Sequence, residues 1–267
     1  MKKYSIIGDG NIGGRLFDLL NINCPKHDIK MTNRSTFGKI KIISESNIVF
    51  ITVKPKDIKD VANDINQIYV AKHIKKVSYL RKGLVVSMMA GIKMEKLQEM
   101  LSWNQPIIRC MPNLPISEKS GCLVCYSNKN TTLEHRKEFT EILKGPDIIW
   151  IDDEKYMNAI TSISGCGPAF LSVFYKFYIQ AAIDLGLPPD LAKKSIYPTI
   201  IGTTTLISKE YNKDPSKDIL SSIISQVASK GGATEQGLDK LLYTSMQKDL
   251  TRVFRSCKEH CDELDNL

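Results

Sequence analysis

The sequence predicts an α/β fold, in which a mainly parallel sheet is followed by an all-α C-terminal domain. Two observations support this prediction. In the first half of the 267-residue chain, short runs rich in isoleucine and valine alternate with helical patterns, as in sheets that helices cover on both faces. From about Asp153 the strand signals stop and long helical patterns continue to the end. We therefore expect two domains, residues 1–152 and residues 153–267.

The elements of the first domain are expected at short intervals. Strands are predicted at Tyr4–Gly8, Ile29–Thr32, Ile48–Val53, Leu84–Ser87, Ile107–Met111 and Ile148–Ile151, and helices at Asn11–Leu20 and Leu133–Leu143.

The second domain is divided by glycine and proline. Gly186 and the prolines after Leu187 indicate the end of one helix and the start of the next. Pro198 should kink that next helix because proline lacks an amide donor, and Pro215 should open a shorter one. The stretch Phe170–Leu187 is apolar but carries a polar stripe, which favours a largely buried helix of a soluble protein over a membrane span.

The charge and the cysteine content limit the classes of function that the chain can have. The net charge of +8 comes from short basic pairs scattered along the chain, without a basic tail, so we expect no nucleic-acid partner. Seven cysteines, an odd number without disulfide-framework spacing, indicate reduced thiols and a cytoplasmic protein. A zinc site could combine Cys122 and Cys125 with Cys257, His260 and Cys261. Leu123 and Val124 favour a buried strand instead, so no metal is predicted.

The clearest motif is Gly8-Asp9-Gly10-Asn11-Ile12-Gly13, which follows a predicted strand and opens a predicted helix. The first glycine permits a tight turn, the second lets the backbone approach a pyrophosphate, and the third lets helix and strand pack closely. The helix N-terminus then offers free amides and a partial positive charge. This pattern predicts a Rossmann-type dinucleotide site, the alternative being a glycine-rich turn without a ligand.

The end of the second strand selects the cofactor. NAD sites usually carry Asp or Glu there to hold the ribose hydroxyls. Here the run is Thr32-Asn33-Arg34-Ser35, with no acid. Arg34 can pair with a 2′-phosphate, and Asn33 and Ser35 can add hydrogen bonds. NADPH is therefore favoured over NADH, unless Arg34 is only a surface arginine.

Five further segments occur in a fixed order. They are Val53-Lys54-Pro55, Ser87–Ile92, Arg109–Pro115, Asn158–Phe170 and Val227–Leu238. Together with the glycine motif they resemble the pyrroline-5-carboxylate reductase family, from about Lys3 to about Arg255. The resemblance implies an oxidoreductase that reduces the cyclic imine 1-pyrroline-5-carboxylate to L-proline with hydride from NAD(P)H, the last step of proline biosynthesis. Asn158 stands where the family usually has Asp, Cys166 where it has Ser and Lys230 where it has Pro, and Pro198 interrupts a helix that normally has no proline.

The resemblance also implies site residues. The cofactor would contact Val53, Lys54, Pro55, Ala90, Gly91 and Asn113 in addition to the glycine motif and residues 33–35. A small anionic substrate would bind at Ser229, Gly231, Gly232, Ala233 and Thr234. Thr234 and Lys54 are the candidate catalytic residues, because a hydroxyl can bond the carboxylate or ring nitrogen and a lysine can orient the nicotinamide. The alternatives are that Thr234 only caps a helix and that Lys54 is a surface residue.

Partners and rival functions complete the expectations. By similarity, two subunits would interleave their apolar helices into a homodimer, with a further ring of dimers as an option, and the active site would lie between one sheet and the partner's helices. After Gly167 no lysine occurs before Lys176, which disfavours the hydroxyacid reductases that place a lysine there. Two alternatives stay open: a reductase of another small cyclic imino acid, and a non-catalytic NADP-binding regulator with the same fold.

Overall fold

The computed structural model describes residues 1–33, 45–75, 83–101 and 105–264. They form two compact units, Met1–Pro168 with Val253–Leu267, and Ala169–Arg252. The expected domains, 1–152 and 153–267, differ from these units because residues 153–168 and the end of the C-terminal helix pack with the sheet. As a statement about functional domains, that boundary stays a prediction.

The first unit is built on one sheet with the strand order β2-β1-β3-β4-β5-β6-β7. The strands are β1 Lys3–Ile7, β2 Asp28–Thr32, β3 Ile48–Ile51, β4 Leu84–Ser87, β5 Ile107–Pro112, β6 Cys122–Ser127 and β7 Asp147–Trp150. All neighbouring strands are parallel except β5 and β6, which are antiparallel. The mainly parallel sheet is confirmed, and Cys122 and Cys125 lie on a strand as expected.

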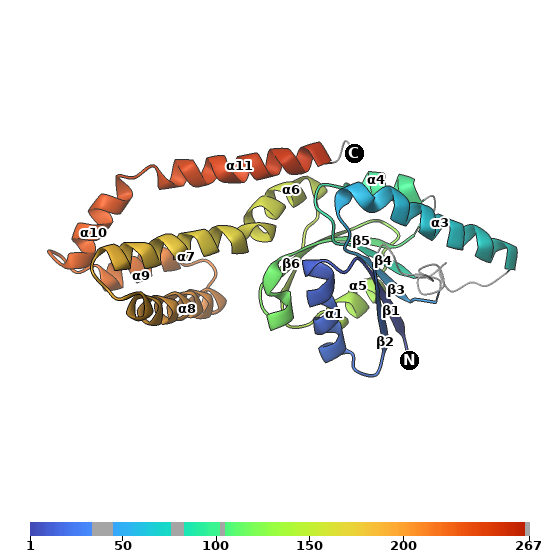
Figure 1. The fold of residues 1–267 in the computed structure, drawn as a ribbon, viewed down its shortest axis with the longest axis horizontal. Helices are drawn as coiled ribbons and strands as arrows, with labels where there is room; N and C mark the ends of the chain where they lie inside the picture. Colours follow the sequence, from blue (N-terminus) through green and yellow to red (C-terminus); the bar gives the residue numbers. More distant parts are fainter. Residues whose placement is uncertain (34–44, 76–82, 102–104, 265–267) are drawn as a thin grey trace. The chain divides into compact units, whose positions relative to one another are not determined.

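Helices cover both faces of this sheet (Figure 1). They are α1 Asn11–Asn23, α3 Ile58–Lys75, α4 Met94–Leu101 and α5 Leu133–Ile142. Leu16 and Leu20 of α1 pack with Phe139 of α5 in one hydrophobic cluster. The helices α3 and α4 contribute Val61 and Leu97 to the cluster on the other face. Because both faces are covered, the central strands β3 and β4 are buried at every position.

Short helical segments lie between elements of the sheet and after its last strand. They are η1 Pro55–Asp57, η3 Leu114–Glu118, η4 Glu154–Tyr156, α6 Met157–Ile160 and the π-helical turn η5 Thr161–Gly165.

The remaining helices are α7 Gly167–Asp184, α8 Pro189–Lys213, α9 Ile219–Val227, α10 Ala233–Leu242 and α11 Met246–Leu264. Gly186 has a φ of 95° and ends α7 as predicted, with the Leu187 amide donating to the Ala182 carbonyl at 3.1 Å. Pro198 lies inside α8. The prediction that Pro215 opens the next helix is wrong. That helix begins at Ile219, because the Asp218 carboxylate caps it by accepting from the Ser221 amide.

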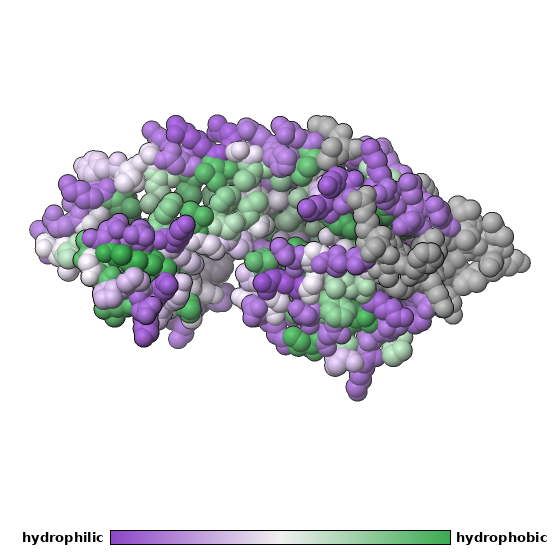
Figure 2. Space-filling model, in the orientation of Figure 1, coloured by the Kyte–Doolittle hydropathy of each residue, from purple (hydrophilic) through white to green (hydrophobic). Residues whose placement is uncertain are grey.

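The expectation that Phe170–Leu187 is largely buried is wrong for the single chain. No side chain of α7 is buried, and Phe177 is 66% exposed, since the other helices of the same chain cover too little of α7. Figure 2 shows hydrophobic residues gathered over the helical unit Ala169–Arg252. Within the described ranges, one helical stretch, Glu154–Asp184, has the length and composition of a membrane span, which core helices of soluble proteins also have.

Candidate functional site

The turn between β1 and α1 depends on close backbone packing. Gly8 has a φ of 118° and its amide donates to the Thr32 carbonyl at 2.8 Å. A Cβ on Gly13 would overlap the Gly8 carbonyl and lie 2.9 Å from Thr52 Oγ1. The Thr52 hydroxyl in turn donates to the carbonyls of Ile7 and Gly8. The first and third glycines therefore have the geometry that the motif predicts.

The N-terminus of α1 is open to an anion. Gly10 is the N-cap residue, no side chain caps the helix, and no acidic residue lies in its first turn. A Cβ on Gly10 would meet nothing within 4 Å, so this side of the backbone is accessible. The free amides of the first turn and the helix dipole suit a diphosphate.

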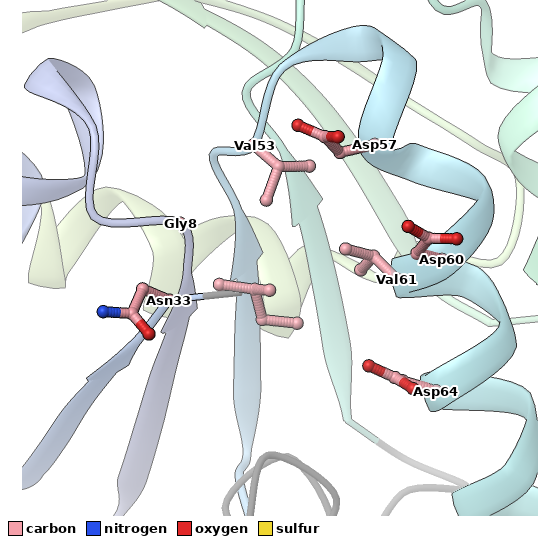
Figure 3. Close-up of a pocket in the computed structure, with 8 residues that line it drawn as sticks. Gly8, Asn33, Val53, Asp57, Asp60, Val61 and Asp64 are labelled. Carbon is pink, nitrogen blue, oxygen red and sulfur yellow. The ribbon is translucent and has the colours of Figure 1, made fainter. Parts of the chain in front are cut away.

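Beside this turn, a hollow lies at the carboxyl ends of β1 and β3. It is lined by Ile7, Gly8, Asn33, Val53, Asp57, Asp60, Val61 and Asp64. Figure 3 shows Asp57 at the end of η1 and Asp60 and Asp64 on α3, with Gly8 and Asn33 on the strand side. The apolar walls suit a flat ring, while the carboxylates can accept hydrogen bonds from an amino group.

Part of the predicted cofactor set falls at this hollow. Asn33 and Val53 line it, whereas Arg34 and Ser35 lie outside the described residues. Lys54 is exposed and precedes the short helix that Pro55 opens.

Asn113 and Ser164 meet although 51 residues separate them in the chain. The Asn113 side-chain amide donates to Ser164 Oγ at 3.5 Å, and Asn113 Oδ1 accepts from the Cys122 amide at 3.1 Å. Cys122 Sγ lies 2.8 Å from the same Ser164 hydroxyl. The predicted cofactor-side segment and the entry to the long helix therefore share one polar cluster. Asn113 is held by protein contacts there.

Ala90 and Gly91 lie in the loop after β4, at the carboxyl edge of the parallel strands. Gly91 has a φ of 79°, and its position is covered by the end of α11, with the Cys261 carbonyl 2.9 Å from where a Cβ would stand. Gly91 is therefore required for the approach of α11.

The predicted substrate loop opens α10 in the helical unit. Gly231 has a φ of 75° and its amide donates to the Glu235 carboxylate at 2.7 Å. Gly232 is the N-cap residue without a side-chain cap, so the interpretation of Thr234 as only a capping residue is wrong. Ala233 and Thr234 are exposed in the first turn, where their amides and the Thr234 hydroxyl can receive an anion. Ser229 accepts from the Gly232 amide through its carbonyl.

The cysteines are all free thiols. Burial, followed by the neighbouring Cys257, raises the pKa of Cys166 to about 11, so this thiol is protonated at neutral pH. Burial likewise raises the pKa of Cys125. In the described part of the chain, no group of three or more His, Cys, Asp and Glu side chains is arranged to hold a metal ion.

Two groups of polar residues were missed from the sequence. The first is the set of aspartates at positions 57, 60 and 64, which line the hollow. Their spacing of three and four residues is that of one helix face and could have been recognised in the sequence. The second is a buried network around Arg109, Glu154 and Asn158. Its members are far apart in the chain, so no local pattern indicates it.

Comparisons with known proteins find similarity to pyrroline-5-carboxylate reductases over both units. Residues 154–264 match the family model described as pyrroline-5-carboxylate reductase dimerisation. The pyrroline-5-carboxylate reductase of Staphylococcus haemolyticus is 29% identical over 274 residues, covering 96% of this chain and 93% of the relative. That of Corynebacterium melassecola is 28% identical and covers 99% of both chains.

Solved structures agree. The crystal structure of Plasmodium falciparum pyrroline carboxylate reductase with NADP bound superimposes with a TM-score of 0.83 at 25% identity, covering 99% of this chain and 98% of that one. A pyrroline-5-carboxylate reductase structure from Coxiella burnetii, at 22% identity and a TM-score of 0.81, supports the fold. The predicted resemblance is confirmed.

Gly13→Ala should abolish detectable NADPH binding, because the new methyl group would overlap the Gly8 carbonyl and force the turn open. The matched control is Gly14→Ala, the next residue of the same helix, where a Cβ meets nothing within 4 Å. We expect the control to bind NADPH normally and to unfold at the same or a higher temperature, since alanine favours helix. Fluorescence titration with NADPH measures the affinity of each variant for the cofactor. Equal binding by the two variants would contradict the assignment of this turn.

Proposed function

We propose that this chain, which is similar to pyrroline-5-carboxylate reductases along its length, reduces 1-pyrroline-5-carboxylate to L-proline with hydride from NADPH, the last step of proline biosynthesis. The observation that carries the proposal is a pair of glycine turns that each open a helix without a side-chain cap, Gly10 at α1 and Gly232 at α10. One suits a diphosphate and the other a small carboxylate.

The residues of the first unit fit the cofactor. The amides at the start of α1 would bind the diphosphate, and the hollow beside Val53 and Val61 would receive the adenine, whose amino group can donate to an aspartate. Carboxylates repel phosphate, so the 2′-phosphate would lie away from α3. The preference for NADPH over NADH rests on Arg34 in the sequence, and the NADP-bound relative supports it.

The residues of the α10 turn fit the substrate. The free amides of Ala233 and Thr234, together with the helix dipole, would hold its carboxylate. The Thr234 hydroxyl would bond the carboxylate or the ring nitrogen, and Lys54 would orient the cofactor. Bound NADPH supplies a hydride to the imine carbon, while the protonated ring nitrogen becomes the amine. Because a protonated imine is already electrophilic, these residues contribute mainly by positioning.

The assembly and compartment are further parts of the proposal. The match to the dimerisation model supports a homodimer, in which the exposed faces of α7 and its neighbours would be covered by a second copy. We place the active site between one subunit's sheet and its partner's helices, with a ring of dimers as a higher assembly. Seven free thiols suit the reducing cytoplasm.

Mixing the purified protein with NADPH and 1-pyrroline-5-carboxylate, and following the loss of reduced-nicotinamide absorbance, tests the proposal. Turnover to proline is expected. Turnover only with a six-membered or sulfur-containing imine would favour the other cyclic imino acid, for which the departures at Asn158 and Lys230 leave room. NADPH binding without turnover of any imine would favour the regulator.

Thr234→Ala should lower kcat by about tenfold or more, because the variant loses a hydrogen bond at the reacting group. Thr234→Ser keeps the hydroxyl and should retain most of the turnover. Steady-state kinetics of the two variants provide the comparison. If alanine and serine behave alike, the hydroxyl has no function in the reaction.

Arg34→Ala should weaken NADPH binding far more than NADH binding, since only NADPH carries the 2′-phosphate. Dissociation constants for both cofactors measure the difference. An equal loss for both would remove Arg34 from the phosphate site.

Phe177→Glu should convert the protein to monomers, because this 66% exposed side chain would lie in the apolar subunit interface, where an unpaired carboxylate is costly. Lys176→Glu introduces the same side chain at the adjacent exposed position on the polar stripe and should leave the dimer intact. Sedimentation or light scattering reports the mass. A dimeric Phe177→Glu variant would argue that α7 is not at the interface.

A further inference from the structure

A buried arginine lies at the centre of a polar network in the first unit. The Arg109 side chain, on β5, is 1% exposed. Its Nη1 donates to Glu154 Oε1 at 2.5 Å and its Nη2 donates to Asn158 Oδ1 at 3.1 Å. A buried guanidinium needs such partners, because an uncompensated buried charge is strongly destabilising. The network therefore ties β5 to the segment that follows the last strand.

Asn158 extends this network to the C-terminal helix. While Oδ1 of Asn158 accepts from Arg109, its Nδ2 donates to Asp262 Oδ1 at 2.8 Å. Asp262 is on the exposed side of α11, where Lys258 pairs with its second oxygen at 2.7 Å. The hydrogen bonds from Asn158 and then Lys258 lower the pKa of Asp262. An aspartate at position 158 could not make the second bond, because an ionised carboxylate has no donor.

The same elements hold the loop between β4 and α4. Glu154 Oε1, which bonds Arg109, also accepts from the Met94 amide at 2.7 Å, at the start of α4. On the other side, the backbone of Cys261 and the side chain of Leu264 cover Gly91. The start of α4 is thus held by Glu154, and Gly91 in the preceding loop is covered by the end of α11. This loop follows a parallel strand at the carboxyl edge of the sheet, where dinucleotides bind in such folds.

We propose that Asn158 is a positioning residue for the cofactor, which pins the end of α11 over the loop Met88–Ile92 through its bond to Asp262 and thereby fixes the loop for NADPH. The inference rests on the cofactor site of the proposed function and does not depend on which imine is reduced. It also gives a physical reason for the asparagine at this position: its partner on α11 is a carboxylate.

The test reverses the donor and the acceptor in the hydrogen bond between residues 158 and 262. Asn158→Asp places two carboxylates face to face, so the end of α11 should detach and the NADPH dissociation constant should rise about tenfold, as expected for the loss of a hydrogen bond to a charged group. Adding Asp262→Asn supplies a donor from the other side, and the double variant should return to within about twofold of the parent.

A matched double variant separates pairing from net charge. Asn158→Asp with Glu263→Gln has the same formal charge as the rescuing pair, but Glu263 pairs weakly with His260 and not with Asn158. It should keep the tenfold defect. Asp262→Ala, at an exposed position that cannot disturb the core, should weaken NADPH binding in the same direction as Asn158→Asp.

Titrations are made without substrate, at a temperature at which every variant is folded by circular dichroism. Hydrogen exchange of residues 88–92 should increase in Asn158→Asp and recover in the rescuing pair. Unchanged NADPH affinity in Asn158→Asp, or equal affinity in the two double variants, would overturn the positioning function. If the parent protein binds NADPH but reduces no imine, the proposed reaction fails and this inference is still tested.

Discussion

The close approach of Gly8 and Gly13 is the constraint on which the site depends. It brings the end of β1 against the start of α1, and the Thr52 hydroxyl joins the end of β3 to the same point through the Gly8 carbonyl. Helix and strands can meet there only because residue 13 has no side chain. The first turn of α1 has no side-chain cap, so its amides are satisfied by water or by a bound anion.

The helical unit, unlike the first unit, leaves many of its apolar side chains exposed. The first unit buries apolar side chains on both faces of its sheet, whereas α7 buries none of its own and leaves Phe174 49% and Phe177 66% exposed. Such a surface gains free energy when a second copy covers it. The helices of this unit and the turn at Gly232, where we propose that the substrate binds, belong to one structural unit. Under the proposed function, association and substrate binding therefore draw on the same part of the chain.

Features that depend on local chemistry were predictable from the sequence. Strands rich in isoleucine and valine, the glycine turn and the helix end at Gly186 all follow from short segments. The errors arise where the determining contact is elsewhere. Asp218 caps α9, so proline at 215 does not start it. Composition alone could not show that the other helices of its own chain leave α7 exposed. The Asn158–Asp262 bond spans 104 residues, a separation that no periodicity reports.

The asparagine at 158 is understandable once its surroundings are known. The family resemblance marks it as a departure, since aspartate is usual there. Arg109 already has a full counter-charge in Glu154 at 2.5 Å, so a second carboxylate at 158 would bring an excess negative charge into a site only 6% exposed. With Asp262 opposite, the repulsion would fall on the contact that holds α11 over Gly91. A neutral side chain that accepts on one side and donates on the other satisfies both neighbours. Sequence comparison alone would have counted this residue as a loss, whereas the contacts make it the link between the sheet and the C-terminal helix.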